Sequence, residues 1–214
     1  MSSHQWSSTA PGGTRIKICG VRDTSDIEAA ADAGADAIGL VLAKDSPRSI
    51  TPERAATLTA AADPRLTVVR LMVDPAEPRL RRRSPGWLQL HGSESVQLVE
   101  AASQVGPVIR AVPFDDIEAI NQWDADPHVA RLLIDSHRGG SGVAFDHETF
   151  AEVAASLTTP WILAGGLNPD TVAAAIQHLH PWGVDVSSGV ESSRGVKDPK
   201  RIAAFCQAVQ AADS

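Results

Sequence analysis

Short apolar runs alternate along the chain with stretches in which alanine and other apolar residues recur at helical spacing. The apolar runs predict strands at residues 15–19, 36–42, 66–73, 86–90, 107–112, 130–135, 160–164 and 183–187. The stretches between them predict helices at residues 24–33, 52–62, 76–84, 94–104, 115–123, 147–156, 169–179 and 198–211. Strand and helix alternate without a break in composition, which predicts an α/β fold with a parallel sheet. So many units in one small domain favour a closed, single-domain (βα)8 barrel, or TIM barrel, over a doubly wound sheet.

The first 13 residues precede this pattern and have neither a basic start nor an apolar core. We therefore interpret residues 1–13 as a disordered leader and not as a secretion signal. In this interpretation residues 14–214 form the catalytic barrel domain.

The composition limits the partners of the protein. The 214 residues carry a formal net charge of −7, which argues against a nucleic-acid-binding or anionic-membrane surface. No apolar run approaches the length of a membrane span. Cys19 and Cys206 are the two cysteines of the sequence, so no disulfide framework is indicated. We expect a cytoplasmic protein with no nucleic-acid or membrane partner.

Loops rich in glycine and serine follow three of the later apolar runs. They supply the small residues Gly140, Ser141, Gly165, Gly166, Ser187 and Ser188. Such residues let backbone N–H groups approach an anion closely, and no side-chain charge is required. Taken alone, the last of these loops is equally compatible with an ordinary turn. Three consecutive strand-to-loop junctions of this kind predict one phosphate site, because barrels often bind phosphate after their last two strands.

Two residues at predicted strand ends have the chemistry for proton transfer. Cys19 follows Lys17 by two positions, and strand alternation puts both side chains on one face. A thiol near an ammonium has a lowered pKa and suits a base or nucleophile, although a small core residue is the alternative interpretation. Asp135 ends the sixth strand, where a carboxylate is poorly placed for packing and well placed for acid–base work. An Asx cap of the next loop is its structural alternative.

Further polar residues follow other strands. Gln89 and His91 share a face at the end of the fourth strand and are candidates to line a pocket, although a lone histidine is more often structural. Arg48 follows the second strand and is a candidate for a bidentate contact with a substrate carboxylate, or else a surface arginine. Metal-ligand spacing and a Gly-x-Gly-x-x-Gly motif after the first strand are both absent from the sequence, so no metal is expected and dinucleotide binding is disfavoured. The combination suggests proton transfer on a small phosphorylated substrate.

Several short motifs stand in a characteristic order along the chain. They are Lys-Ile-Cys-Gly at 17–20, Ser-Pro-Arg at 46–48, Leu-Gln-Leu-His-Gly at 88–92, Leu-Ile-Asp-Ser at 133–136, Gly-Gly-Ser-Gly at 139–142, Leu-Ala-Gly-Gly-Leu at 163–167 and Gly-Val-Asp-Val-Ser-Ser-Gly-Val-Glu at 183–191. In these motifs the chain resembles the phosphoribosylanthranilate isomerases of tryptophan biosynthesis. The resemblance extends from about residue 15 to residue 210. It implies a (βα)8 barrel that needs no cofactor and occurs as a monomer or a homodimer.

The resemblance also implies a reaction, the Amadori rearrangement of N-(5′-phosphoribosyl)anthranilate to 1-(o-carboxyphenylamino)-1-deoxyribulose 5-phosphate. It implies that Asp135 is the general acid, which protonates the furanose ring oxygen. It implies that Cys19, as a thiolate, is the general base that removes the proton from C2′, with Lys17 as a hypothetical helper. Arg48 matches the position that holds the anthranilate carboxylate. We place these further residues in the substrate-binding site: Gln89, His91, Gly140, Ser141, Gly165, Gly166, Asp185, Ser187 and Ser188.

The chain departs from the family pattern near the expected anthranilate pocket. Leu40 and Leu42 stand where aromatic residues are usual, and His147 replaces another aromatic residue. Arg70 and Met72 stand where a small residue and a phenylalanine are usual. These changes predict less aromatic surface and an added cation near that pocket, with the acid, the base and the phosphate site intact.

Two other functions fit the residues less well. A different sugar-phosphate isomerase, of the histidine-pathway type, is expected to carry an aspartate at the position of Cys19. A non-catalytic protein that binds a phosphate ligand needs neither Cys19 nor Asp135. We therefore predict an isomerase.

Overall fold

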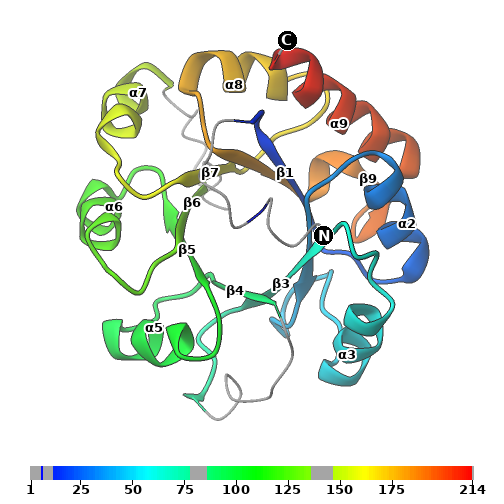
Figure 1. Ribbon diagram of the computed structural model, residues 1–214, viewed down its shortest axis with the longest axis horizontal. Coiled ribbons are helices and arrows are strands. Elements are labelled where there is room, and N and C mark those ends of the chain that lie inside the picture. The colour runs from blue at the N-terminus through cyan, green and yellow to red at the C-terminus, as the bar shows by residue number, and fades with distance from the viewer. Residues whose placement is uncertain (1–5, 7–11, 78–85, 136–146, 214) are drawn as a thin grey trace.

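Parallel strands close into a barrel in sequence order, and the last strand pairs with the first. The computed structural model describes Trp6 and residues 12–77, 86–135 and 147–213, and it shows the strands ringed by helices (Figure 1). The barrel strands are β1 (Arg15–Cys19), β2 (Ala37–Val41), β3 (Thr67–Met72), β4 (Trp87–Leu90), β5 (Val108–Pro113), β6 (Arg131–Asp135), β7 (Trp161–Ala164) and β8 (Gly183–Val186). The predicted strands and the predicted (βα)8 barrel are confirmed.

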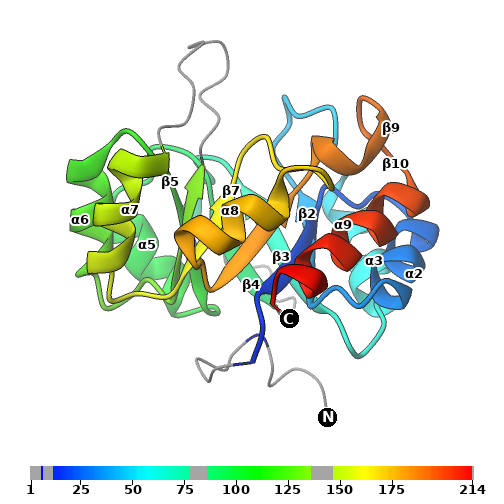
Figure 2. The same cartoon turned by 90° about the horizontal axis from the view of Figure 1, so that it is seen from above.

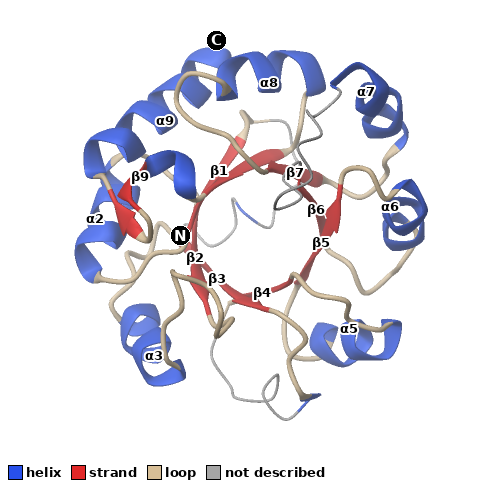
Figure 3. Cartoon of the chain, turned by 180° about the vertical axis from the view of Figure 1, so that it is seen from behind, coloured by secondary structure: helices blue, strands red, loops and turns tan. Residues whose placement is uncertain are grey.

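The helices lie outside this ring of strands (Figure 3). They are α2 (Thr24–Asp32), α3 (Pro52–Ala60), α5 (Val96–Ser103), α6 (Ile117–Asp124), α7 (His147–Ser156), α8 (Val172–Leu179) and α9 (Pro199–Ala212). Each of them corresponds to a predicted helix. The predicted helix at 76–84 falls mostly on residues 78–85, which lie outside the described residues. None of the described helices is long and apolar enough to cross a membrane.

Five of the described helices begin where a short polar side chain accepts a hydrogen bond from a backbone N–H group of the first turn. Asp23, Thr51, Ser95, Asp116 and Asp198 cap α2, α3, α5, α6 and α9 in this way. Helices α3 and α9 also have a proline in the first turn, where no N–H donor is needed. Because these signals are local, the sequence predicts the helix starts closely.

An insertion follows β8 before the last helix. It consists of a single turn of 3-10 helix, η1 (Ser188–Val190), and an antiparallel pair, β9 (Glu191–Ser193) and β10 (Val196–Lys197). Figure 2 shows β9 and β10 at one end of the barrel. This insertion extends from the carboxyl end of β8, the end at which barrels bind their ligands.

Alternate strand residues divide the interior into two apolar layers. Outward side chains such as Ile18, Ile38 and Leu132 pack under the helices. Inward side chains such as Val69 and Leu133 fill the barrel. At the carboxyl ends of the strands the inner positions become polar or small, and this change marks the site.

Trp6 closes the opposite end of the barrel, where the strands begin. Its side chain is fully buried, and its ring packs edge-on at centroid distances of 5.0 Å from Trp182 and 6.3 Å from Trp87. The Arg131 guanidinium lies over the Trp182 and Trp87 rings, at 4.4 and 5.4 Å, and donates to the Trp6 carbonyl at 3.5 Å. Trp6 belongs to the segment predicted to be a disordered leader, of which residues 1–5 and 7–11 lie outside the described residues. This tryptophan, by contrast, is part of the barrel core.

Candidate active site

The carboxyl ends of the strands surround a cavity of about 360 Å³. Most of the predicted site residues line it: Cys19, Arg48, Gln89, His91, Asp135, Gly165, Gly166, Asp185, Ser187 and Ser188. The predicted Gly140 and Ser141 lie outside the described residues. Among the residues that the structure describes, no group of three or more His, Cys, Asp or Glu is placed to hold a metal ion.

A thiol, an ammonium and a carboxylate meet where β1 pairs with β8. Lys17 is fully buried, and its Nζ donates to Asp185 Oδ1 at 2.8 Å and also to the Cys19 thiol. Gly39, on the neighbouring strand β2, gives this cluster its room. A Cβ atom at Gly39 would lie 2.8 Å from Cys19 Sγ and 3.1 Å from Lys17 Nζ, too close for a larger residue to fit without displacing them. Sequence reasoning missed Gly39, although a glycine inside an apolar strand is a signal of close approach.

Burial is the largest single influence on the pKa values of both Cys19 and Lys17. Burial raises the pKa of the Cys19 thiol; the Lys17 ammonium lowers it and the Asp185 carboxylate raises it again. Burial also acts to lower the pKa of Lys17, but Asp185 and Cys19 outweigh it, so the pKa is raised and Lys17 stays protonated. The sequence predicted a lowered thiol pKa, and this is wrong for the structure, because Asp185 offsets the ammonium and burial disfavours a thiolate.

Polar contacts lead from β4 to Asp135. Gln89 Nε2 lies 3.0 Å from His91 Nδ1, and His91 Nε2 lies 3.3 Å from Asp135 Oδ2. We assign the tautomer from the first contact: the amide nitrogen donates to Nδ1, so the ring proton is on Nε2, the nitrogen nearer Asp135. Gln89 thereby orients His91 beside the carboxylate.

Arg48 reaches the cavity from the loop after β2 and is held by a buried glutamate. Its Nε donates to Glu191 Oε1 at 2.6 Å and its Nη2 to Glu191 Oε2 at 2.9 Å. Hydrogen bonding to Glu191 raises the pKa of Arg48, although burial opposes it. Sequence reasoning selected Arg48 but missed Glu191 as its partner. The available signal was a carboxylate two residues after the small-residue loop at 187–189.

The loops after β7 and β8 are in direct contact. Gly165 and Gly166 have φ angles of 90° and 67°, a region that favours glycine. Gly189 packs against the Leu167 carbonyl so closely that a Cβ atom would collide with it. Ser187 Oγ donates to the Cys19 carbonyl at 3.0 Å, which ties the second loop to β1. Small residues in such loops let backbone N–H groups approach an anion closely.

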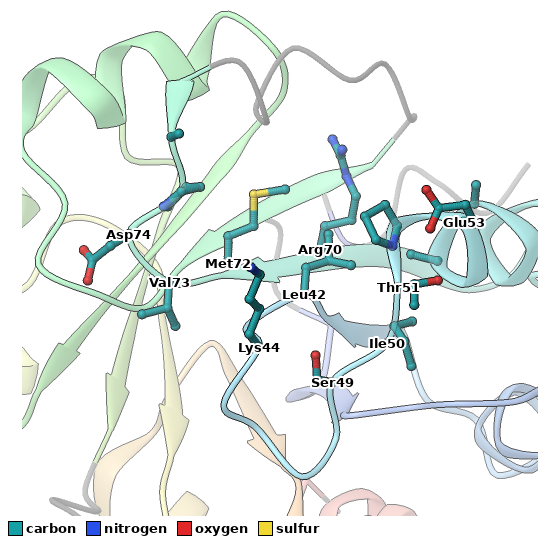
Figure 4. A pocket seen from close by; sticks show the side chains of 15 residues that line it. Leu42, Lys44, Ser49, Ile50, Thr51, Glu53, Arg70, Met72, Val73 and Asp74 are labelled. Carbon is teal, nitrogen blue, oxygen red and sulfur yellow. The ribbon is translucent and has the colours of Figure 1, made fainter.

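The residues that depart from the family pattern mainly have side chains on the outer face of the strands, not inside the barrel. Leu40 and Met72 belong to the apolar layer under the helices. Arg70 is paired in register with Leu40 and lines a separate cavity of about 1020 Å³ beside α3 (Figure 4). The two cavities share only Val73 among their lining residues. Arg70 therefore does not line the cavity that contains Arg48, the residue expected to bind the anthranilate carboxylate.

The arrangement suits acid–base chemistry on an anionic molecule. A thiol, a carboxylate beside a histidine and an arginine line one small cavity. The backbone beside this cavity can hold an anion. The buried cations near it are ion-paired, Lys17 with Asp185, and Arg48 and Lys197 with Glu191.

Comparison with known proteins adds independent findings. The family model of N-(5′phosphoribosyl)anthranilate (PRA) isomerase matches residues 16–208. The N-(5′-phosphoribosyl)anthranilate isomerase of Chromohalobacter salexigens is 42% identical over 203 residues, which cover 92% of this chain and 94% of that protein. The crystal structure of TrpF from Jonesia denitrificans is 40% identical and superposes with a TM-score of 0.82, covering 93% of this chain and 98% of that one. A crystal structure of phosphoribosyl anthranilate isomerase in complex with reduced 1-(o-carboxyphenylamino)-1-deoxyribulose 5-phosphate is 28% identical, with a TM-score of 0.80, and covers 92% of this chain and 99% of that one.

Proposed function

The chain belongs to the N-(5′-phosphoribosyl)anthranilate isomerase family, enzymes of tryptophan biosynthesis that interconvert an aldose and a ketose, and from that premise we propose both its product and its acid–base pair. The product is 1-(o-carboxyphenylamino)-1-deoxyribulose 5-phosphate, Asp135 is the general acid and Cys19 is the general base. One observation carries this proposal: Cys19 and Asp135, from strands β1 and β6, line the same cavity together with Arg48. A protein that only bound the substrate would need neither proton-transfer group.

The first step is opening of the furanose ring. Asp135 gives its proton to the ring oxygen, and the ring opens to a protonated Schiff base. The negative charge that this leaves on Asp135 is stabilised by the His91 Nε2–H donor, 3.3 Å away. Gln89 supports this role because it holds His91 in the tautomer that donates.

The second step is removal of the proton at C2′. Burial keeps the pKa of the Cys19 thiol raised at rest, so ionisation must be favoured when it is needed. The positive charge of the protonated Schiff base, together with that of Lys17, favours release of the thiol proton to water, which leaves the thiolate at that stage. The thiolate then takes the C2′ proton, and the resulting enolamine tautomerises to the ketone.

The two ends of the substrate bind to opposite parts of the site in this proposal. The phosphate lies against the loops after β7 and β8, with Gly165, Gly166, Ser187 and Ser188. The anthranilate carboxylate pairs with Arg48. Anchoring both anionic ends orients the pentose between Asp135 and Cys19.

The proposal is tested by the loss of anthranilate fluorescence when the purified protein meets freshly generated N-(5′-phosphoribosyl)anthranilate. We expect turnover in the native protein and a ~10²- to 10⁴-fold loss of kcat in Cys19→Ala and in Asp135→Asn, the usual contribution of a general acid or base. Cys206→Ala is the matched control, because Cys206 is the other buried cysteine and lies on α9. Absence of turnover in the native protein, or full turnover in either site variant, would overturn the proposal.

A further inference from the structure

Glu191 is a buried carboxylate whose hydrogen-bonding capacity is taken up by the protein. Only 6% of the residue is exposed. Besides the two bonds from Arg48, Oε2 accepts from the Gly195 N–H at 3.0 Å and Oε1 accepts from Lys197 Nζ at 3.0 Å. Burial raises the pKa of Glu191, but Arg48, Gly195 and Lys197 outweigh it and lower the pKa to about 2. Glu191 therefore stays ionised and has no proton to exchange at neutral pH.

The contacts of Glu191 occupy one edge of the Arg48 guanidinium and leave the other edge open. A guanidinium presents two donor edges that can each grip a carboxylate. Glu191 takes the edge formed by Nε and Nη2. The other edge, which includes Nη1, has no hydrogen-bond partner among the described residues, and Arg48 lines the cavity. That edge remains for a carboxylate of a ligand.

Lys197 links Glu191 to the loop after β8, the other anion-binding part of the site. Its side chain is fully buried, and besides Glu191 it donates to the Ser187 carbonyl at 2.8 Å and approaches Ser187 Oγ at 3.4 Å. Ser187 begins the loop that follows β8. Glu191 thus bonds on one side to Arg48 and on the other, through Lys197, to the backbone of the proposed phosphate loop.

We infer that Glu191 is a positioning residue that holds Arg48 at a set distance from the loop at Ser187. The pair then selects ligands in which a carboxylate and a phosphate are separated by a fixed span. This inference rests on the proposed function, because that function supplies a substrate with a carboxylate at one end and a phosphate at the other.

Charge and position make opposite predictions for Glu191→Gln. The substitution removes one negative charge beside two cations, so the site becomes more positive. If charge alone governed binding, anions would bind the variant more tightly. If Glu191 acts by holding Arg48, a ligand carboxylate binds more weakly, because the guanidinium loses its bidentate partner.

The experiment measures the dissociation constants of anthranilate and of inorganic phosphate for the full-length protein, by calorimetry. We expect Glu191→Gln to weaken anthranilate binding by about tenfold or more, the loss of roughly one charge-assisted hydrogen bond. Phosphate binding should weaken less, and the KM of the substrate should rise by a larger factor than kcat falls. Glu191→Asp keeps the charge but retracts it by one methylene, so it should also weaken anthranilate binding; it gives the result if Glu191→Gln does not fold.

Asp36→Asn is the matched control, since Asp36 pairs with Arg15 at the other end of the barrel, 3.4 Å away. It should leave both dissociation constants unchanged. Equal or tighter binding of anthranilate to Glu191→Gln would overturn the inference, and so would an equal weakening of both ligands, which would indicate a structural role only. Both ligands are measured without turnover, so a failure of the isomerase proposal would appear separately, as native protein that binds them but converts no substrate.

Discussion

Replacing Lys17 with methionine tests how charge is balanced beside Cys19. Lys17 is fully buried, Asp185 is 8% exposed, and their ion pair spans 2.8 Å. Methionine fills much of the same volume but leaves the Asp185 carboxylate without its partner. Removing one member of a buried ion pair costs ~3–5 kcal/mol of stability, because a charge stays buried and uncompensated.

We therefore expect Lys17→Met to lose about 3 kcal/mol of unfolding free energy at neutral pH, a large part of the ~5–15 kcal/mol typical of a domain.

The assay is urea unfolding of the native protein, Lys17→Met and the double variant Lys17→Met/Asp185→Asn at neutral pH. The double variant should recover much of the loss, because no buried charge is left unpaired. Alkylation of Cys19 by iodoacetamide in a Cys206→Ala background gives a second measurement. Alkylation should be slower in Lys17→Met at a given pH, since the ammonium that lowers the thiol pKa is gone. An unchanged urea midpoint in Lys17→Met, or no recovery in the double variant, would refute this reasoning.

Three further predictions follow from the site. Gly39→Ala places a Cβ atom 2.8 Å from Cys19 Sγ, so kcat should fall at least ~10-fold while phosphate binding persists. Steady-state kinetics with phosphate as an inhibitor measures both, and an unchanged kcat would contradict the prediction. Gly189→Ala forces apart the loops after β7 and β8, so inorganic phosphate should inhibit ~10-fold more weakly; equal inhibition would count against the proposed cradle. The pKa of Glu191 is lowered from 4.5 to about 2, so this carboxylate contributes ~3 kcal/mol of stability. The contribution is present above pH ~4.5 and is lost as the pH falls toward 2. Acid unfolding of Glu191→Gln should therefore lack this part of the pH dependence.

The sequence predicts the barrel well because its signals are local. Caps such as Asp23 and Thr51 start helices within one turn of themselves, and each apolar run is long enough to be a strand. The carboxyl ends of parallel strands meet at one end of a barrel, so Cys19, His91 and Asp135 come together without any knowledge of the packing.

Contacts that depend on packing between distant segments are not predictable in this way. The pairing of Lys17 with Asp185 depends on the register in which β8 closes onto β1, and this pairing, with burial, reverses the predicted direction of the Cys19 pKa shift. A similar limit explains why Arg70 lines the cavity beside α3. Inward and outward side chains alternate along a strand, so a shift of one residue changes which cavity a side chain lines. The burial of Trp6 against Trp182 likewise joins segments far apart in the chain.

The central claim is the division of labour between Asp135 and Cys19, and turnover of a substrate deuterated at C2′ tests it most directly. If Cys19 removes the C2′ proton, the native protein should convert the deuterated substrate more slowly than the unlabelled one. Asp135→Asn should be slow with both substrates and show a smaller isotope effect, because ring opening then limits the rate. Cys19→Ala should convert neither at a significant rate. Rapid conversion of both substrates by Cys19→Ala, or an isotope effect that Asp135→Asn leaves unchanged, would contradict the assignment.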